Sequence, residues 1–324
     1  MPLVASRYRA PSWLPGGHLQ TIWPARLVPL PAVSYRRERW PTPDDDFIDV
    51  DFARPEPAEA GAPVLALFHG LEGDSRSHYA RVTMRHFADL GWRAMVVHFR
   101  GCSGEPNLTL RAYHSGDSEE GDWVLRTIRQ RWPVAPLHAV GISLGGNMLA
   151  KWLGERGEDA RFVTSAASIG SPLDLVAGGH AIGRGFNRLY TRMFLATLKA
   201  KARDKAERFG YAIDIEVLRR ARDLYDFDNA FTAPVHGFRD TLDYWTRASA
   251  KPLLGNVRVP HLVLNARNDP FVPAESLPHA GEVSAAVTLE QPMEGGHIGF
   301  AEGPFPGHLR FLPQRLEQFF KEAR

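Results

Sequence analysis

Five short, uninterrupted apolar runs constrain the fold of this chain more than any other feature of its sequence. Runs of this length are typical of strands that are buried on both faces of a sheet. Segments with helical spacing separate them, so strands and helices alternate along the chain. This alternation predicts a mostly parallel central sheet with helices on both faces. The runs cover residues 64–68, 94–97, 137–142, 163–169 and 262–264, and the helical segments cover residues 79–90, 117–131 and 145–157.

The part of the chain before the first run has a different character. Residues 11–31 are rich in proline, glycine and tryptophan, which is typical of irregular structure, so we expect an arm draped over the body of the protein. Strand-like stretches follow at residues 34–40 and 47–52. The second alternates apolar and acidic residues, which predicts a partly exposed antiparallel strand.

The regular alternation is interrupted after the fourth run. Residues 175–250 contain helical periodicity without a clear strand. We therefore predict a helical cap at 175–250, inserted into an α/β core that comprises residues 1–174 and 251–324. The N-terminal arm of this core spans residues 1–33. A chain of 324 residues is long enough for one α/β domain with such an insertion.

A serine between two glycines lies at the junction of a predicted strand and a predicted helix. Gly141-Ile142-Ser143-Leu144-Gly145 ends the run 137–142 and opens the helical segment that follows. A nucleophile elbow requires this strand–turn–helix setting, in which a strained turn exposes the serine at the carboxyl end of a sheet. Glycines relieve the crowding at such a turn, and the helix N-terminus favours developing negative charge. Ser143 is therefore the predicted nucleophile.

A serine hydroxyl is a weak nucleophile and needs a base beside it. His297 lies in a glycine-rich loop near the end of the chain, after a candidate last strand at residues 286–289. Asp269 directly follows the strand at 261–266, where a carboxylate can hold the second nitrogen of the imidazole. The order serine, acid, histidine matches the expected fold class. Asp174, which follows the strand at 163–169, is the alternative acid.

Two backbone amides are candidates for an oxyanion hole. His69-Gly70-Leu71 follows the first run, and a His-Gly step there is similar to the loop that supplies one N–H in lipases and esterases. The residue after the nucleophile supplies the second N–H. We therefore assign the donors to Leu71 and Leu144 and expect His69 to be structural.

Charge and cysteine content exclude several other classes of protein. The formal net charge of +2 is too small to indicate a nucleic-acid partner, and the single cysteine, Cys102, cannot form an intrachain disulfide. We see no signal peptide, bilayer-spanning stretch, metal-ligand spacing or dinucleotide motif. We expect a cytoplasmic protein that needs no cofactor and no metal. The basic run from Lys199 to Arg208 is typical of a solvated helix face, with peripheral contact to a lipid surface as the alternative.

A set of motifs, in this order, resembles the YheT-like family of α/β-hydrolases, a group of carboxylesterases. The resemblance spans nearly the whole chain, and it implies Ser143 as nucleophile, Asp269 as acid and His297 as base. Asn268 is a departure, since relatives often carry a second aspartate there. Eukaryotic relatives include enzymes that act on lipid esters. The motifs lie at residues 17–21, 69–73, 99–104, 113–116, 141–146, 227–238 and 265–271.

The sequence thus predicts a serine hydrolase that cleaves carboxylic esters through an acyl-enzyme. The expected substrate is a small-molecule ester, short- to medium-chain or derived from a lipid. A thioesterase or amidase could use the same residues, and a ligand-binding protein could keep the fold without catalysis. Apolar cap residues such as Met193 and Leu195 could face either the core of the cap or the substrate. The oligomeric state and the natural substrate stay open.

Overall fold

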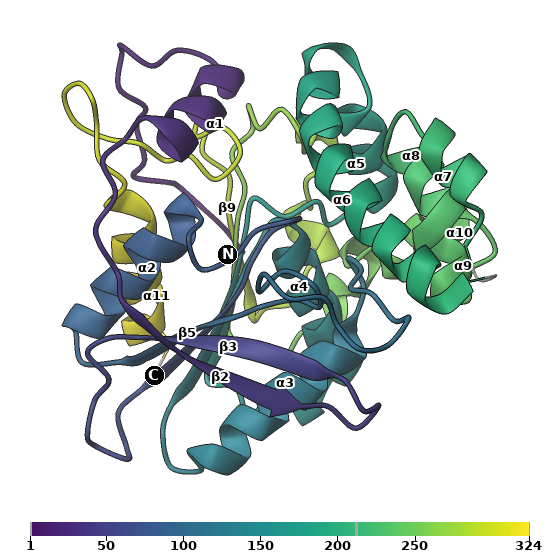
Figure 1. The fold of residues 1–324 in the computed structure, drawn as a ribbon. Helices are drawn as coiled ribbons and strands as arrows, with labels where there is room; N and C mark the ends of the chain where they lie inside the picture. The colour runs from purple at the N-terminus through teal and green to yellow at the C-terminus, as the bar shows by residue number, and fades with distance from the viewer. Residues whose placement is uncertain (1, 211–212, 324) are drawn as a thin grey trace.

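The protein is built around a single twisted sheet, which runs through the centre of the molecule in Figure 1. The structure is a computed structural model and describes residues 2–210 and 213–323. Within these residues the sheet has nine strands in the order β1-β9-β8-β7-β6-β4-β5-β3-β2. Only the β2–β3 and β3–β5 pairs among them are antiparallel. The predicted mostly parallel sheet is confirmed. The strands are β1 Leu3–Val4, β2 Tyr35–Pro41, β3 Phe47–Ala53, β4 Val64–Phe68, β5 Arg93–Val97, β6 Leu137–Ile142, β7 Ser165–Ile169, β8 His261–Leu264 and β9 Val287–Glu290.

Helices cover both faces of this sheet, as the sequence predicts. On one face, α2 (His78–Asp89) and α11 (Phe311–Glu322) pack around Phe87 and Phe320. On the other face, α3 (Ser118–Arg131) and α4 (Leu144–Arg156) pack their apolar sides against β4 and β6. Because the central strands are covered twice, most of the residues in them are apolar. Asp117 caps α3 by accepting a hydrogen bond from the amide of Glu120, which is the start signal of such a helix.

Strand β3 confirms the predicted antiparallel pairing but corrects the predicted exposure. All of its residues are buried, because β3 lies between β2 and β5. Its carboxylates are buried too, but each is paired: Asp49 lies 2.8 Å from Arg39 and Asp51 lies 2.7 Å from Arg37, both on β2. The alternation in the sequence therefore marks paired charges and not a solvated face, since buried carboxylates need such partners.

The N-terminal arm is also more ordered than its composition suggests. The prediction of irregular structure is wrong for α1, a helix at Gly17–Arg26, and β1 pairs in parallel with β9. Pro24 lies inside α1, where it cannot donate to the carbonyl of Gln20 four residues earlier. The backbone of Gly299 packs so closely on that carbonyl that a side chain there would clash. Tertiary packing therefore stabilises a helix that local sequence disfavours.

A separate layer of helices is formed by the part of the chain that connects β7 to β8, and it lies on the right of Figure 1. Its first helix begins with Leu175 and its last ends at Ala248. The division into a core and a cap at residues 175–250 stays a prediction. The layer has a small core of its own that contains Leu195, Leu198 and Ala202, whereas Met193 is half exposed. Its members are α5 Leu175–Ile182, η2 Gly185–Asn187, α6 Arg188–Phe209, α7 Ile215–Arg220, α8 Leu224–Phe227, η4 Asp228–Thr232, α9 Ala233–Val235 and α10 Thr241–Ala248. The remaining short helices are η1 Gly157–Ala160, η5 Lys251–Asn256, η6 Ala274–Ser276 and η7 Ala280–Glu282.

Candidate active site

Ser143 occupies the sharp turn between β6 and α4. Its backbone has φ 51° and ψ −114°, a left-handed conformation that is strained for any residue with a side chain. The turn brings Gly141 against the backbone of Gly145 and Gly146, and it brings Gly145 against the carbonyl of Phe68 at the end of β4. A side chain at either glycine would collide with this backbone, which is the crowding that the sequence pattern predicts.

His297 and Asp269 meet this serine from the other half of the sheet. The Nε2 atom of His297 lies 3.0 Å from Ser143 Oγ, and its Nδ1 atom lies 2.8 Å from Asp269 Oδ2. The other carboxylate oxygen of Asp269 accepts the amide of Phe271 at 2.8 Å, and its side chain is fully buried. Within the described residues, Asp269 is the only carboxylate that contacts the histidine. The alternative acid, Asp174, instead caps α5 by accepting the amide of Ala177.

Helix α1 fixes the loop that carries the histidine, a role that the sequence analysis missed. The Oγ1 atom of Thr21 accepts the backbone N–H of His297 at 2.8 Å and donates to Gly17. The buried amide of Gln20 accepts from Gly295 and from Asn268, the neighbour of the acid. Both residues lie in the Gly17–Thr21 motif, one of the motifs that resemble the YheT-like family.

We expect the change Thr21→Val to lower kcat without a matching change in KM. The valine keeps the shape of threonine but leaves the His297 N–H without an acceptor, so the loop loses its alignment. Misalignment of a catalytic group by a fraction of an ångström typically costs on the order of ten- to a hundredfold in rate. Steady-state kinetics on a p-nitrophenyl ester provide the measurement, and Thr21→Ser, which restores the hydroxyl, is the control. An unchanged kcat in the folded valine variant contradicts this role.

The two amides assigned to the oxyanion hole have no hydrogen-bond acceptor among the described residues. They are the backbone N–H groups of Leu71 and Leu144. Leu144 begins α4 directly after the serine, and the neighbouring Gly70 approaches the Cβ of Ser143 closely. His69 is structural: it is fully buried, it bonds the carbonyl of Gly70, and it accepts the amide of Phe99. Burial lowers the pKa of His69 to about 3, so it stays neutral and holds this loop.

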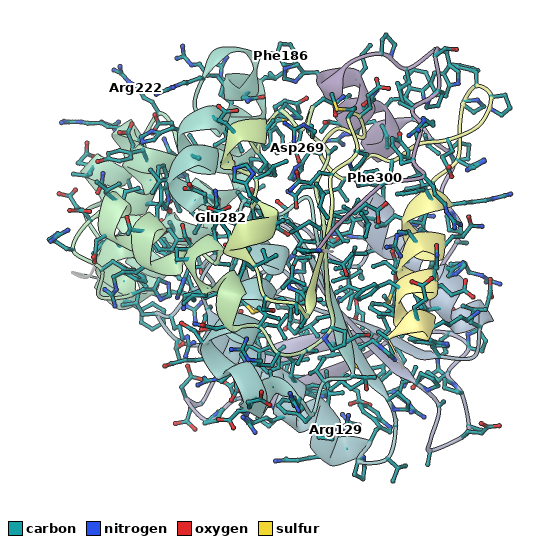
Figure 2. All side chains as sticks on the ribbon, turned by 180° about the vertical axis from the view of Figure 1, so that it is seen from behind. Arg129, Phe186, Arg222, Asp269, Glu282 and Phe300 are labelled. Atoms are coloured by element: carbon teal, nitrogen blue, oxygen red, sulfur yellow. The ribbon has the colours of Figure 1, made fainter. Side chains whose placement is uncertain are left out.

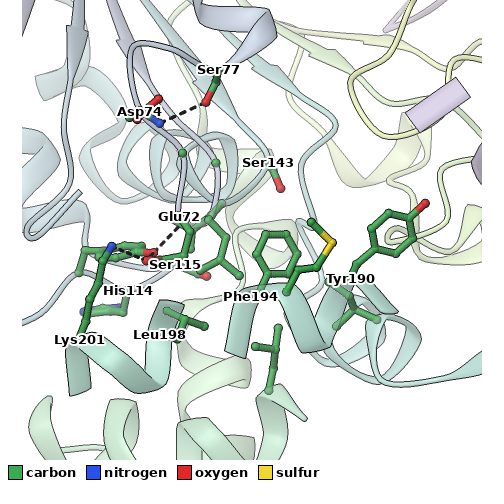
Figure 3. Close-up of a pocket in the computed structure, with 18 of the residues that line it drawn as sticks. Glu72, Asp74, Ser77, His114, Ser115, Ser143, Tyr190, Phe194, Leu198 and Lys201 are labelled. Carbon is green, nitrogen blue, oxygen red and sulfur yellow. Dashed lines mark hydrogen bonds and ion pairs between the residues drawn. The ribbon is translucent and has the colours of Figure 1, made fainter. Parts of the chain in front are cut away.

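A cavity of about 1060 Å³ lies between the cap and the carboxyl end of the sheet, with Ser143 and His297 in its wall. Figure 3 shows Tyr190, Phe194 and Leu198 along α6, lining the cavity beneath the serine. Different faces of α6 therefore have different surroundings. Met193 and Phe194 line the cavity, whereas Leu195 packs in the core of the cap. A cavity of this size and apolar character can accommodate a substrate with an alkyl chain.

The predicted solvated face of α6 is wrong for Lys205, which is buried, whereas Lys199 and Lys201 are partly exposed and have polar partners. Lys201 lies 2.8 Å from Glu72, in the loop next to Leu71 (Figure 3). Glu72 also accepts the hydroxyl of Tyr113. Lys205 is buried and donates to the carbonyls of Thr109 and Arg111. Lys199 donates to the carbonyls of Arg219 and Ala221, at the end of α7. The sequence shows that these residues are charged, but it cannot show which segments lie opposite them. Among these contacts, the ion pair of Lys201 with Glu72 links the cap to the loop that carries Leu71.

Two other nucleophilic side chains are not available for catalysis. Burial raises the pKa of the Cys102 thiol to about 12, so the reactive thiolate is not formed near neutral pH. Ser168 Oγ lies 2.9 Å from His261 Nε2, but both residues are fully buried in the sheet and neither lines the cavity. The hydroxyl of Ser168 donates to the carbonyl of Gly146, and burial lowers the pKa of His261 to about 3. This pair supports the elbow and has no access to a substrate.

Comparison with known proteins agrees with the fold. Residues 63–304 match the family described as alpha/beta hydrolase fold. The chain is 38% identical to "Putative esterase YheT" of Escherichia coli strain K12, over 92% of this chain and 88% of that one. It is 29% identical to the human protein "Phospholipase ABHD3", over 98% of this chain and 79% of that one. An esterase structure from Pyrococcus furiosus superposes with a TM-score of 0.56 at 15% identity, covering 90% of this chain and 91% of the other, which concerns the fold alone.

Proposed function

Since the chain belongs to the α/β-hydrolase family, within its YheT-like group, we propose that it is a serine hydrolase that cleaves carboxylic esters. The observation that supports this most strongly is the line of hydrogen bonds from Asp269 through His297 to Ser143, at the wall of a large apolar cavity. One relative is named as an esterase and another as a phospholipase. These names favour an ester substrate that is short- to medium-chain or derived from a lipid.

In the proposed mechanism Ser143 Oγ attacks the ester carbonyl while its proton passes to His297 Nε2. Asp269 accepts the Nδ1–H of the histidine and stabilises the imidazolium that forms. The negative charge on the carbonyl oxygen is received by the amides of Leu71 and Leu144, which have no competing acceptor among the described residues. His297 then protonates the leaving alcohol. It later takes a proton from the water that attacks the acyl-enzyme, and it returns this proton to Ser143 Oγ as the carboxylic acid leaves.

A fluorophosphonate probe tests this proposal directly. It should label Ser143 in the wild-type protein and should leave the folded Ser143→Ala variant unlabelled, because the buried Ser168 and the protonated Cys102 do not react. Hydrolysis of p-nitrophenyl esters of graded chain length, compared with matched thioesters and anilides, then separates an esterase from a thioesterase or an amidase. Folded protein that resists labelling would instead favour a ligand-binding protein with this fold.

We further expect the cap to set the preference for acyl-chain length, and α6 offers a matched pair of variants. Met193→Ala removes a side chain that lines the cavity, so it should change the ratio of octanoate to acetate hydrolysis by on the order of tenfold. Leu195→Ala removes a side chain from the core of the cap, so it should lower the free energy of unfolding by about 2–4 kcal/mol and leave this ratio unchanged. The measurements are kcat/KM for both esters and thermal unfolding. An equal loss of both activities in the Met193 variant contradicts a role in selectivity.

A further inference from the structure

Large apolar side chains are exposed at the end of the molecule where α1, the start of α6 and the loop at residues 303–307 meet. Each is between 49% and 68% exposed. Figure 2 shows one of them, Phe186, projecting at this end, far from Arg129 at the opposite end. We refer to this set as the apolar rim, because exposed patches of this kind mark sites of interaction. Its members are Leu19, Leu27, Phe186, Leu189, Met193 and Phe305.

The apolar rim is one continuous surface, because side-chain contacts join its three segments. The rings of Trp13 and Trp23 pack on Phe305 with centroids 5.6 and 5.4 Å away, and their indole N–H groups bond the loop that carries it. On the other side, the ring of His18 on α1 lies 4.7 Å from Phe186. Leu189 also lines the large cavity, so the cavity reaches this surface.

The segments that form this surface are positively charged as well as apolar. Residues 13–30, 184–194 and 303–307 include four arginines and no acidic residue, which gives +4, whereas the whole chain carries only +2. All four guanidinium groups lie on exposed residues. None has an ion pair or a side-chain hydrogen bond within the described residues, although many other arginines of the protein are paired. The four are Arg26, Arg184, Arg188 and Arg192.

We propose that the apolar rim docks on the surface of a lipid bilayer that contains anionic lipids. Exposed apolar side chains flanked by arginine are the features of a segment that lies in the membrane interface, and each arginine is attracted by negatively charged head groups. The indole rings beneath the rim suit the same interface. No helix among the described residues is long and apolar enough to cross a bilayer, so the contact is peripheral. If the proposed ester hydrolysis also holds, docking would open the cavity onto the membrane, and a lipid ester could enter without crossing water.

Co-sedimentation with vesicles tests the docking without reference to catalysis. We expect the wild-type protein and the Ser143→Ala variant to bind vesicles of phosphatidylcholine mixed with phosphatidylglycerol, and to bind pure phosphatidylcholine much more weakly. Raised salt should weaken the binding. The double variant Arg188→Glu/Arg192→Glu should lower the partition coefficient by about 25-fold or more. The double variant Leu27→Ser/Phe186→Ser should lower it by on the order of tenfold per side chain.

Two control pairs match these changes on other surfaces. Arg203→Glu/Arg220→Glu changes the net charge by the same amount at exposed arginines away from the rim. Leu108→Ser/Val134→Ser changes apolar residues that are more exposed than Leu27 and Phe186. Both controls should bind like the wild type, and thermal unfolding should show that every variant folds. Absence of binding to anionic vesicles overturns the proposal, and so does an equal loss in the rim variants and their controls. Because the Ser143→Ala variant is included, a failure to bind and a failure to hydrolyse esters are distinguished.

Discussion

Replacement of Ser143 by alanine should lower kcat for ester hydrolysis by on the order of 10⁴ or more, while the fold stays intact. Alanine keeps the Cβ atom, so the strained backbone at φ 51° and the close glycine contacts around it are unchanged. The change removes only the Oγ atom that lies 3.0 Å from His297. Steady-state kinetics measure the effect, and an unaltered thermal unfolding temperature shows that the loss is chemical.

The same experiment separates a concerted unit from independent groups. His297→Ala should cost about as much as Ser143→Ala, and the double variant should be hardly worse than either single variant, since residues that act as one unit are strongly non-additive. If the Ser143→Ala variant keeps most of its activity, the proposed mechanism is wrong. If the two losses simply add in the double variant, the serine and the histidine do not act together.

The second large effect is expected at Asp269. In Asp269→Asn the amide group can still accept the N–H of Phe271 through its oxygen, so the loop should fold normally. Its NH₂ group then faces the Nδ1 atom of His297 and holds the proton of the imidazole on Nε2, where it cannot accept the proton of Ser143. A wrong tautomer of this kind costs about 10⁴ in kcat.

Asp174→Asn is the matched control for this substitution. Asp174 caps α5, and asparagine is as good an N-cap as aspartate. Activity should therefore stay within a few-fold of wild type and the protein should lose little stability. Kinetics and thermal unfolding of both variants provide the comparison. The reverse ranking would move the acid to the end of β7.

The strands and the serine turn could be predicted from the sequence because their physical causes are local. A strand that is buried on both faces of the sheet needs a run of apolar residues such as Val64–Phe68. A turn whose backbone packs closely on its neighbours needs glycines such as Gly141. The positions of Asp269 and His297 could be inferred because parallel strands all end at the same edge of the sheet. Their mutual distances depend on how distant segments pack, and only the structure provides them.

The features that the sequence concealed depend on partners distant along the chain. Helix α1 contains a proline and begins at a pair of glycines, and it forms because its backbone packs on the loop around Gly299. Asp49 and Asp51 resemble surface residues until Arg39 and Arg37 are seen beside them. Lys201 and Lys205 resemble a solvated face because periodicity records which residues share a side of α6, and not what lies opposite that side.

The hydrogen bond between Thr21 and the amide of His297 joins residues 276 positions apart, and this separation has a consequence for the order of events during synthesis. The N-terminal part of a nascent chain begins to fold while the rest is still being made. Helix α1 is made well before the loop that it must hold, because that loop lies much later in the chain. Closure of such a long loop is costly in entropy and comes late. If the proposed mechanism holds, the nucleophile turn is likewise made before its base, so the nascent chain would be inert towards esters until the loop with His297 has been made and held by α1.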